Sequence, residues 1–298
     1  MSDEAQHRAG FVALVGRTNA GKSTLLNRLL GRKLAIVTPK PQTTRHRILG
    51  VVSRPDTQFI FVDTPGLHEA HNLLGQRMIK VARQSLADAD VALWIVDAEA
   101  GLLAEDRRGL ESLASEKRPV VVALNKMDRV RKPALLPLLS AVGDLVPGRH
   151  VVPVSALRGE NIEDLVGTLR EVLPESPPLF PEDFETDLPE KFFAAEMVRE
   201  QLMFGTHQEV PYQTAVRIDA FEEKPEKNLV VIEAQIVVAR PSQRAIVLGD
   251  KGSRIRDVGK KARLAIEKLL GVRVYLGLHV KVDAGWFARE RTLEELGL

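Results

Sequence analysis

The chain has 298 residues, of which 28% are charged and 44% hydrophobic, which is typical of a soluble globular protein long enough for two domains. It contains no cysteine, and this excludes a disulfide framework, a thiol nucleophile and a thiolate metal site. The first ten residues lack the apolar core of a signal peptide, and no apolar run is long enough to cross a bilayer. We therefore expect a cytoplasmic protein.

The net charge of +2 conceals an uneven distribution of charge along the chain. Acidic residues greatly outnumber the two basic ones, Lys191 and Arg199, between Glu175 and Glu209. From Arg240 to Arg291 the balance reverses, with thirteen Lys and Arg against five Asp and Glu. The basic segment indicates a polyanionic partner.

Over residues 1–173, short apolar runs alternate with amphipathic stretches. The apolar runs predict buried strands at 11–15, 59–62, 91–96, 120–124 and 151–154, with an antiparallel edge strand at 46–52. The amphipathic stretches predict helices at 22–30, 76–86, 103–115, 134–145 and 162–173. This alternation predicts an α/β domain with a mostly parallel sheet and helices on both faces. Ligands of such sheets bind at the carboxyl ends of the strands.

A second domain of different composition follows a proline-rich stretch. Residues 174–183 are interpreted as the interdomain linker. Beyond them we expect a helix at 184–203, strands at 212–221 and 229–238, helices at 242–247 and 253–270, and a strand at 272–282. The order α-β-β-α-α-β predicts a separate α+β domain over residues 184–298.

The first motif is a loop of pattern G-x-x-x-x-G-K-S between the first predicted strand and helix. Such a loop points its backbone N–H groups at a phosphate, and the helix adds its positive dipole end. Lys22 can reach the β- and γ-phosphates. A glycine turn without a ligand is the alternative, which the strand and helix around the loop disfavour. The residues expected to contact nucleotide here are Gly16, Asn19, Ala20, Gly21, Lys22, Ser23 and Thr24.

Two further segments are expected to complete a phosphate and magnesium site. Asp63-Thr64-Pro65-Gly66 follows the strand at 59–62, and alone it would be an ordinary turn. After a phosphate loop it predicts that Asp63 holds Mg²⁺ through a water and that the Gly66 N–H senses the γ-phosphate. In the polar loop 39–45, Thr44 is the expected Mg²⁺ ligand when GTP is bound, with Thr43 as the alternative. The predicted metal ligands are thus Ser23, Thr44 and Asp63.

The third and fourth motifs predict guanine rather than adenine. In Asn125-Lys126-Met127-Asp128, the Asp128 carboxylate can accept from N1–H and the exocyclic amine of guanine, a pair of donors that adenine lacks. The Lys126 stem can lie along the base, while Asn125 ties the loops together. Ser155-Ala156 then supplies a backbone N–H to the guanine O6. Together with the first two motifs, they predict a GTP switch.

These motifs resemble the translation-factor-related GTPases. Gln42-Thr43-Thr44-Arg45 with the Asp63 motif resembles the Era and tRNA-modification branch. Ras-like enzymes orient the attacking water with a glutamine at the place occupied here by Leu67. The resemblance implies that Asn19 coordinates a K⁺ ion beside the phosphates; alternatively, Asn19 only shapes the loop. The expected reaction is Mg²⁺-dependent hydrolysis of GTP to GDP and phosphate, with catalytic residues Lys22, Thr44, Gly66 and Asn19.

In the second domain, a G-x-x-G turn joins two predicted helices. Such a turn lets an RNA backbone approach, as in KH domains, and the element order matches the bacterial, type II KH fold. The alternative is a helix–turn–helix with a solvated basic face. We expect an apolar groove lined by Ile246, Val247, Ile255 and strand residues. The expected RNA contacts are Gly249, Asp250, Lys251, Gly252, Arg254 and Arg256.

A GTPase domain followed by a KH domain resembles the Era family over almost the whole chain. The resemblance implies a monomeric protein that binds the 3′ end of 16S ribosomal RNA and assists assembly of the 30S subunit. It also implies that some of the protein contacts the membrane peripherally. An RNA-binding scaffold with slow turnover, and a related GTPase acting on tRNA or the large subunit, are the alternatives. The amphipathic tail 286–293 is expected to pack back on its domain, rather than to contact RNA or a membrane.

Overall fold

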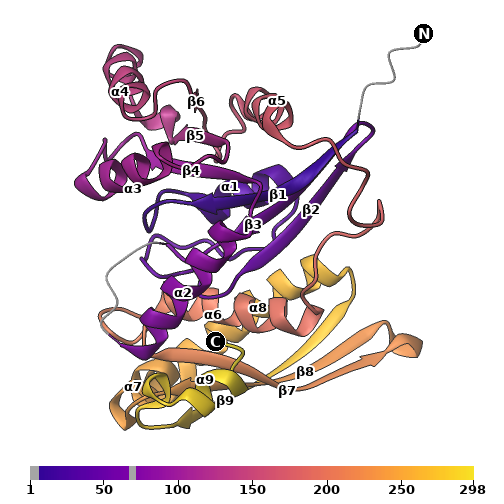
Figure 1. The fold of residues 1–298 in the computed structure, drawn as a ribbon. Helices are drawn as coiled ribbons and strands as arrows, with labels where there is room; N and C mark the ends of the chain where they lie inside the picture. Colours follow the sequence, from indigo (N-terminus) through magenta and orange to yellow (C-terminus); the bar gives the residue numbers. More distant parts are fainter. Residues whose placement is uncertain (1–6, 67–71) are drawn as a thin grey trace. The chain divides into compact units, whose positions relative to one another are not determined.

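A computed structural model describes residues 7–66 and 72–298 (Figure 1). The chain forms two compact units. Of the described residues, the N-terminal unit takes in 7–35, 44–66 and 78–187, and the C-terminal unit takes in 36–43, 72–77 and 188–298. The main division therefore falls at residue 187 rather than within 174–183. In addition, two short segments of the expected first domain group with the C-terminal unit, because their contacts are made there.

The N-terminal unit contains a six-stranded sheet in the order β2-β3-β1-β4-β5-β6. Its β2 is antiparallel to β3, and the other neighbours are parallel, as expected for a P-loop GTPase domain. The strands are β1 (Arg8–Val15), β2 (Ile48–Arg54), β3 (Thr57–Asp63), β4 (Val91–Asp97), β5 (Val120–Asn125) and β6 (His150–Pro153). The helices are α1 (Lys22–Leu30), α2 (Leu73–Ala87), α3 (Ala104–Ala114), α4 (Lys132–Leu145) and α5 (Ile162–Val172), with a 3-10 turn η1 (Met127–Arg129).

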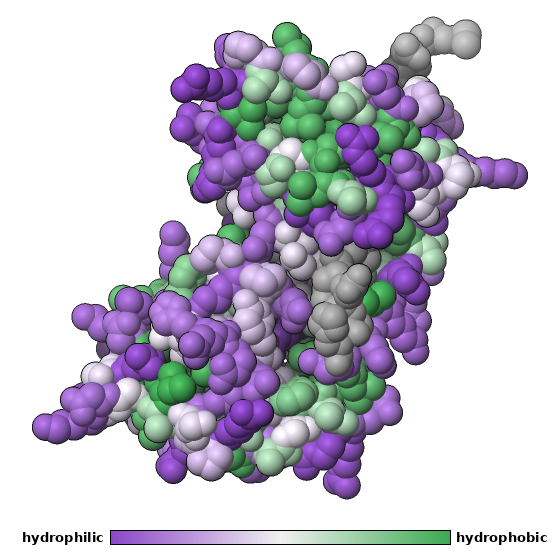
Figure 2. Space-filling model, turned by 90° about the vertical axis from the view of Figure 1, so that its left-hand side faces the viewer, coloured by the Kyte–Doolittle hydropathy of each residue, from purple (hydrophilic) through white to green (hydrophobic). Residues whose placement is uncertain are grey.

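Three strands of this sheet are buried along their whole length. Every residue of β3, β4 and β5 is buried, which explains their nearly continuous apolar sequences. Buried residues of α3 and α4 pack with Trp94 and its strand neighbours in one core. On its outer side α4 exposes Leu136, whose exposed fraction is 70%. Figure 2 views the side on which Figure 1 places α3 and α4, and it shows hydrophobic residues gathered in its upper part.

The proline-rich stretch expected to act as a linker packs on the sheet of the N-terminal unit. Phe180 and Phe184 stack with ring centroids 4.8 Å apart and cover the apolar patch of β2 and β3. The Gln58 side chain accepts hydrogen bonds from the backbone N–H groups of Leu179 and Phe180, at 2.7 and 2.9 Å. Val51 N–H donates to the Glu185 carbonyl at 2.8 Å. The stretch is therefore attached at several points.

The C-terminal unit is an α+β fold with the strand order β7-β8-β9. Its β7 and β8 are antiparallel, whereas β8 and β9 are parallel. Helices α6 and α8 contribute most of the helical residues of its core. The elements are α6 (Glu190–Gly205), β7 (Thr214–Lys224), η2 (Pro225–Lys227), β8 (Leu229–Val238), α7 (Pro241–Leu248), η3 (Asp250–Gly252), α8 (Ser253–Leu270), β9 (Arg273–Val282), η4 (Trp286–Ala288) and α9 (Glu290–Glu295). This arrangement is a type II KH domain.

Two sequence expectations about this unit have different outcomes. The helix expected at 184–203 begins only at Glu190, because Pro189 is its extended N-cap residue and residues before it are irregular. The tail packs back on its own unit as expected. Trp286 is fully buried and its indole N–H donates to the Gln213 carbonyl at 3.0 Å, while Leu293 is also fully buried. Among the described residues, no helix combines the length and apolarity needed to span a bilayer.

Candidate nucleotide and RNA sites

The loop between β1 and α1 curls around the side chain of Lys22. The Lys22 ammonium donates to the carbonyls of Gly16 and Arg17, at 3.1 and 2.8 Å. Gly21 is the N-cap of α1 with φ 97°, and a Cβ there would lie 2.2 Å from the Asn125 side chain. Asn19 also adopts a left-handed conformation, with φ 62°. The loop thus has the left-handed and close-approach positions that a phosphate cradle requires.

Three side-chain oxygens meet beside this loop. The Ser23 hydroxyl donates to the Asp63 carboxylate at 2.6 Å and lies 2.8 Å from the Thr44 hydroxyl. The Thr44 hydroxyl is 3.5 Å from the same carboxylate oxygen. The neighbouring Thr43 hydroxyl is turned elsewhere, 2.7 Å from the hydroxyl of Thr38. Of the two candidate threonines, Thr44 is the one that shares a site with Ser23 and Asp63.

The charges of this site are strongly affected by burial. Asp63 is completely buried, and burial raises the pKa of its carboxyl to about 6, although nearby Lys22 opposes the shift. Burial likewise lowers the pKa of the Lys22 ammonium to about 8. The second carboxylate oxygen of Asp63 has no hydrogen-bond partner among the described residues. A buried carboxylate oxygen beside two hydroxyls is a donor set that suits a hard divalent cation such as Mg²⁺.

The end of the third strand approaches the phosphate loop closely at Gly66. A Cβ at Gly66 would lie 2.7 to 2.9 Å from atoms of Thr18, so this position has no room for a side chain. Thr64 fixes the turn by donating its hydroxyl to the Leu14 carbonyl at 2.9 Å. Leu67, which stands at the place of the water-orienting glutamine, lies outside the described residues.

The guanine motifs converge through Asn125 and Asp128. The Asn125 amide donates to the Ala20 carbonyl at 2.9 Å and accepts from the Ala156 N–H at 3.0 Å. It therefore links the phosphate loop to the Ser155-Ala156 loop, as the sequence predicts. The Asp128 carboxylate accepts from the Ser155 hydroxyl at 2.7 Å, and its side chain is only 6% exposed. These contacts hold the Asp128 carboxylate in one orientation.

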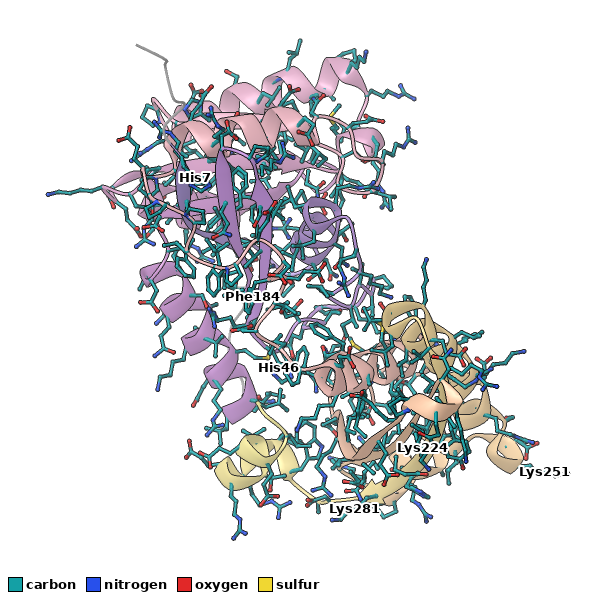
Figure 3. All side chains as sticks on the ribbon, turned by 90° about the vertical axis from the view of Figure 1, so that its right-hand side faces the viewer. His7, His46, Phe184, Lys224, Lys251 and Lys281 are labelled. Atoms are coloured by element: carbon teal, nitrogen blue, oxygen red, sulfur yellow. The ribbon has the colours of Figure 1, made fainter. Side chains whose placement is uncertain are left out.

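In the C-terminal unit the G-x-x-G turn occupies η3 and the start of α8. Gly249, Lys251 and Gly252 all have positive φ, of 71°, 46° and 76°. A Cβ at Gly249 would lie 2.7 Å from the Cβ of Arg254. Figure 3 shows Lys251 at the outer end of the turn, directed away from the body of its unit. The turn thus exposes backbone and one lysine, as expected of a clamp for a nucleic-acid backbone.

The two arginines expected to contact RNA are engaged with the turn itself. Arg254 donates to the Ile246 carbonyl, and Arg256 donates to the carbonyls of Gly252 and Lys251 at 3.1 and 2.9 Å. These hydrogen bonds are exposed to solvent. In this arrangement they brace the turn and add positive charge to it.

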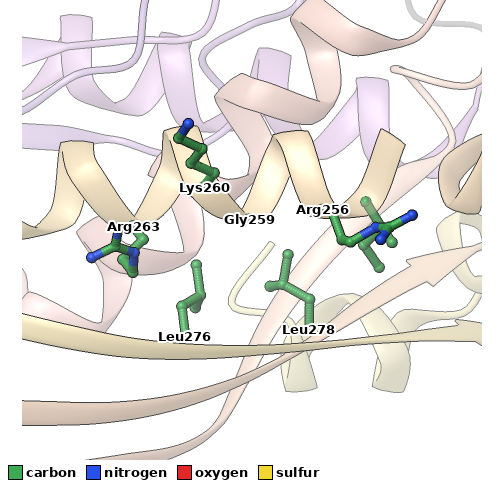
Figure 4. A pocket seen from close by; sticks show the side chains of 7 residues that line it. Arg256, Gly259, Lys260, Arg263, Leu276 and Leu278 are labelled. Carbon is green, nitrogen blue, oxygen red and sulfur yellow. The ribbon is translucent and has the colours of Figure 1, made fainter. Parts of the chain in front are cut away.

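A groove of about 330 Å³ runs beside the turn, between α8 and β9 (Figure 4). Its lining combines apolar and basic residues: Ile255, Arg256, Gly259, Lys260, Arg263, Leu276 and Leu278. A Cβ at Gly259 would be 3.3 Å from Leu278, so this glycine keeps the groove open. Ile255 lines the groove as expected. The expectation for Val247 is wrong, because Val247 is fully buried in the core instead.

Comparisons with known proteins agree with this geometry. A family profile described as "50S ribosome-binding GTPase" matches residues 11–126, and a KH-domain profile matches residues 209–287. GTPase Era of Geotalea uraniireducens is 46% identical over 294 residues, covering 99% of this chain and 99% of the relative. GTPase Era of Geobacter metallireducens is 44% identical, covering 100% and 99%. The chain belongs to the Era family of GTPases.

Solved structures of Era have the same fold. A crystal structure of Era in complex with MgGDPNP and nucleotides 1506–1542 of 16S ribosomal RNA superposes with a TM-score of 0.94. It is 42% identical and covers 98% of this chain and 99% of that one. A point variant of Aquifex aeolicus Era bound to GDP·AlF4⁻ gives a TM-score of 0.92 at 42% identity, covering 97% and 99%. The chain is thus a GTP-hydrolysing member of the Era family with a KH domain.

Sequence reasoning missed several residues that the structure places beside these motifs. Asp97 accepts from the Lys126 ammonium at 2.6 Å. Asp97 could have been predicted from its position at the carboxyl end of β4, because it lies in register with Asn125 on β5. Lys260 and Arg263 were also missed, although they follow Arg256 at helical spacing and so form one stripe along α8.

Proposed function

We propose that this Era family protein is a GTP-driven switch that binds the 3′ end of 16S ribosomal RNA through its KH domain and assists 30S subunit assembly. The observation that carries the proposal is that one chain combines the Ser23, Thr44 and Asp63 cluster with a basic KH groove. The solved relative at 42% identity, which was crystallised with MgGDPNP and 16S nucleotides 1506–1542, supports the choice of RNA.

The nucleotide roles are assigned to the four motifs. Gly16 to Thr24 hold the phosphates, Lys22 faces the β- and γ-phosphates, and Gly66 offers its N–H to the γ-phosphate. Asn125, Lys126, Asp128, Ser155 and Ala156 bind the base. The buried hydrogen-bond partners of Asn125 and Asp128 support this part of the assignment, since they preorganise both loops.

Mg²⁺ is assigned to Ser23, Thr44 and, through a water, Asp63. The buried carboxylate oxygen of Asp63, which lacks a partner among the described residues, supports this assignment. When bound, Mg²⁺ neutralises negative charge on the β- and γ-phosphates. The residues of the chain then hold the phosphates in place: Lys22 provides a fixed positive charge and the loop provides backbone N–H groups.

We further assign Asn19 to a K⁺ ion beside the phosphates. The position of Asn19 in the phosphate loop supports this role, where it is a non-glycine residue held at a positive φ of 62°. Hydrolysis is then faster in K⁺ than in Na⁺ at equal ionic strength, and Asn19→Ala abolishes the difference. Equal rates in the two salts with an unaltered Asn19→Ala rate would leave Asn19 with a role in loop shape only.

The RNA roles are assigned to the turn and the groove together. Gly249 to Gly252 allow the backbone of a single strand to approach, and Lys251 pairs with a phosphate. Arg256, Lys260 and Arg263 line one side of the groove with positive charge, while Leu276 and Leu278 offer an apolar surface to the bases. Arg254 contributes charge at the turn. Affinity should therefore fall as the salt concentration rises.

The test uses a labelled single strand that copies the 3′ end of 16S ribosomal RNA. Lys251→Asp combined with Gly252→Asp reverses a charge and places a carboxylate where the backbone would approach. We expect RNA affinity to fall by at least tenfold, as measured by fluorescence anisotropy. Lys191→Asp makes the same reversal at an exposed position on α6 and should leave affinity within about twofold. Unchanged affinity of the double variant would remove the clamp assignment.

The remaining expectations stay predictions. They are action on the 30S subunit, a monomeric state, a cytoplasmic location and peripheral membrane contact of a fraction of the protein. Because Trp286 and Leu293 are fully buried, the tail is not the segment that we assign to membrane contact. Sedimentation of the purified protein, alone and with 30S subunits, tests the first two.

A further inference from the structure

The segment just before Thr44 belongs to the C-terminal unit. Residues 36–43 group with that unit, and the division falls between Thr43 and Thr44. Three residues of the segment are hydrogen-bonded to α6 or to its C-cap residue. The Glu200 carboxylate accepts from the Val37 N–H at 2.9 Å, and Lys40 donates to the carbonyls of Met203 and Thr206 at the end of the helix. The third attachment comes from Arg199, whose guanidinium donates to the Thr43 carbonyl.

The charges that make these attachments are buried. Arg199 is 3% exposed, Glu196 is 5% exposed and Glu200 is 2% exposed. Glu196 binds Arg199 in a two-point pair, with Nε to Oε1 at 2.7 Å and Nη2 to Oε2 at 2.6 Å. Burying charged groups is costly unless they are paired with good geometry. The pair therefore holds the guanidinium plane in one orientation, in which the Arg199 Nη2 faces Thr43.

The carbonyl that Arg199 binds is part of the peptide that joins Thr43 to Thr44. Fixing that carbonyl fixes the peptide plane, and hence the direction in which the chain enters Thr44. The Thr43 hydroxyl reinforces the turn from within, since it donates to the Lys40 carbonyl at 2.7 Å. The Thr44 hydroxyl then lies 2.8 Å from the hydroxyl of Ser23 in the cluster assigned to Mg²⁺.

We infer that Arg199, oriented by Glu196, is a positioning residue for Thr44, so that a helix of the KH unit helps to set the metal-binding loop of the GTPase site. The inference rests on the proposed function, because it needs Thr44 to bind Mg²⁺ in the GTP state. Linkage makes the coupling reciprocal: a bound γ-phosphate and Mg²⁺ that order Thr44 also strengthen the attachment of residues 36–43 to α6.

The test compares GTP-analogue with GDP affinity. The double variant Glu196→Gln with Arg199→Met removes both charges of the ion pair, so that neither partner of the pair stays buried without the other. We expect affinity for the non-hydrolysable analogue in Mg²⁺ to fall roughly tenfold, the effect of losing one charge-assisted hydrogen bond. Affinity for GDP should change less than twofold, because the Thr44 contact is specific to the triphosphate state. The Mg²⁺ concentration for half-maximal analogue binding should rise.

Controls separate positioning from general damage. Arg217→Met removes an arginine of β7 that pairs with Asp219 at 2.8 Å, and it should alter neither affinity. Lys40→Met loosens the same segment without disturbing the buried pair, and it should lower the analogue affinity but not the GDP affinity. This variant tests the inference even if the double variant fails to fold.

The outcomes distinguish this inference from the proposed function. If the unaltered protein fails to bind the GTP analogue in Mg²⁺, the proposed function fails. If it binds the analogue while Lys40→Met and the folded double variant keep its GTP-over-GDP preference, only the positioning role is overturned. Equal losses for GDP and the analogue would also overturn it, because they indicate a purely structural contribution.

Discussion

Replacing Asp128 with asparagine tests the guanine site at one atom. The carboxylate is 6% exposed and accepts the Ser155 hydroxyl at 2.7 Å, while the Arg158 Nε lies 3.8 Å from its other oxygen. In Asp128→Asn, one acceptor for the guanine N1–H remains. The second becomes an N–H₂ group facing the exocyclic amine, so that two donors oppose each other. A hydrogen bond to a charged group contributes about 1.5–3 kcal/mol, so GTP affinity should fall by about ten- to a hundredfold.

The same variant should gain affinity for xanthosine triphosphate. Xanthine carries a carbonyl where guanine has its amine, and the new amide can donate to it. Titration calorimetry with each nucleotide in excess Mg²⁺ measures both changes. Asp144→Asn, at an exposed position on α4, should change neither affinity. If Asp128→Asn left the preference for GTP over xanthosine triphosphate unchanged, the account of base recognition would be refuted.

Four further substitutions should change the stability of the protein. Gly109→Ala should destabilise by about 1–3 kcal/mol, because its Cβ would lie 2.0 Å from the buried Trp94 ring. By contrast, the Cβ in Gly167→Ala meets no atom within 4 Å, so this variant should stabilise the folded protein by up to about 1 kcal/mol. The melting temperature should therefore fall in Gly109→Ala and rise in Gly167→Ala. Trp286→Ala removes a fully buried ring and should cost about 3–5 kcal/mol in urea unfolding; a cost below about 1 kcal/mol would contradict its packing. Asp63→Asn should stabilise the nucleotide-free protein, because burial raises the pKa of this carboxyl from 3.8 to about 6. The folded state then disfavours ionisation, so the gain appears as pH rises from about 4 to 6 and levels off near about 3 kcal/mol above that. Thermal unfolding of both forms at pH 4 and pH 8 measures it, and an equal difference at the two pH values would contradict the pKa argument.

The sequence predicts the nucleotide domain well because its elements are locally encoded. Buried parallel strands require continuous apolar runs, and the turns that follow them carry the motifs. The edge strand β2 is antiparallel as expected. Glycines of the phosphate loop could be anticipated, since the close approaches at Gly16 and Gly21 leave no room for a side chain.

What could not be predicted depends on contacts between distant parts of the chain. Helix α6 has little amphipathic pattern, because polar residues such as Glu196 and Arg199 are buried along with its apolar ones, and its start was placed too early. Periodicity also gives no sign that residues 36–43 belong with α6. Phe180 appears in a proline-rich stretch that reads as a free linker, yet it packs against the sheet.

The proposed function requires that nucleotide binding and RNA binding are coupled in one chain. The most direct test measures binding of a labelled single strand copying the 3′ end of 16S ribosomal RNA, first with GDP and then with a non-hydrolysable GTP analogue, both in Mg²⁺. We expect tight, salt-sensitive binding that is stronger in the analogue-bound state. Equal affinity in the two nucleotide states would contradict the coupling, and no binding in either state would contradict the assignment of the RNA.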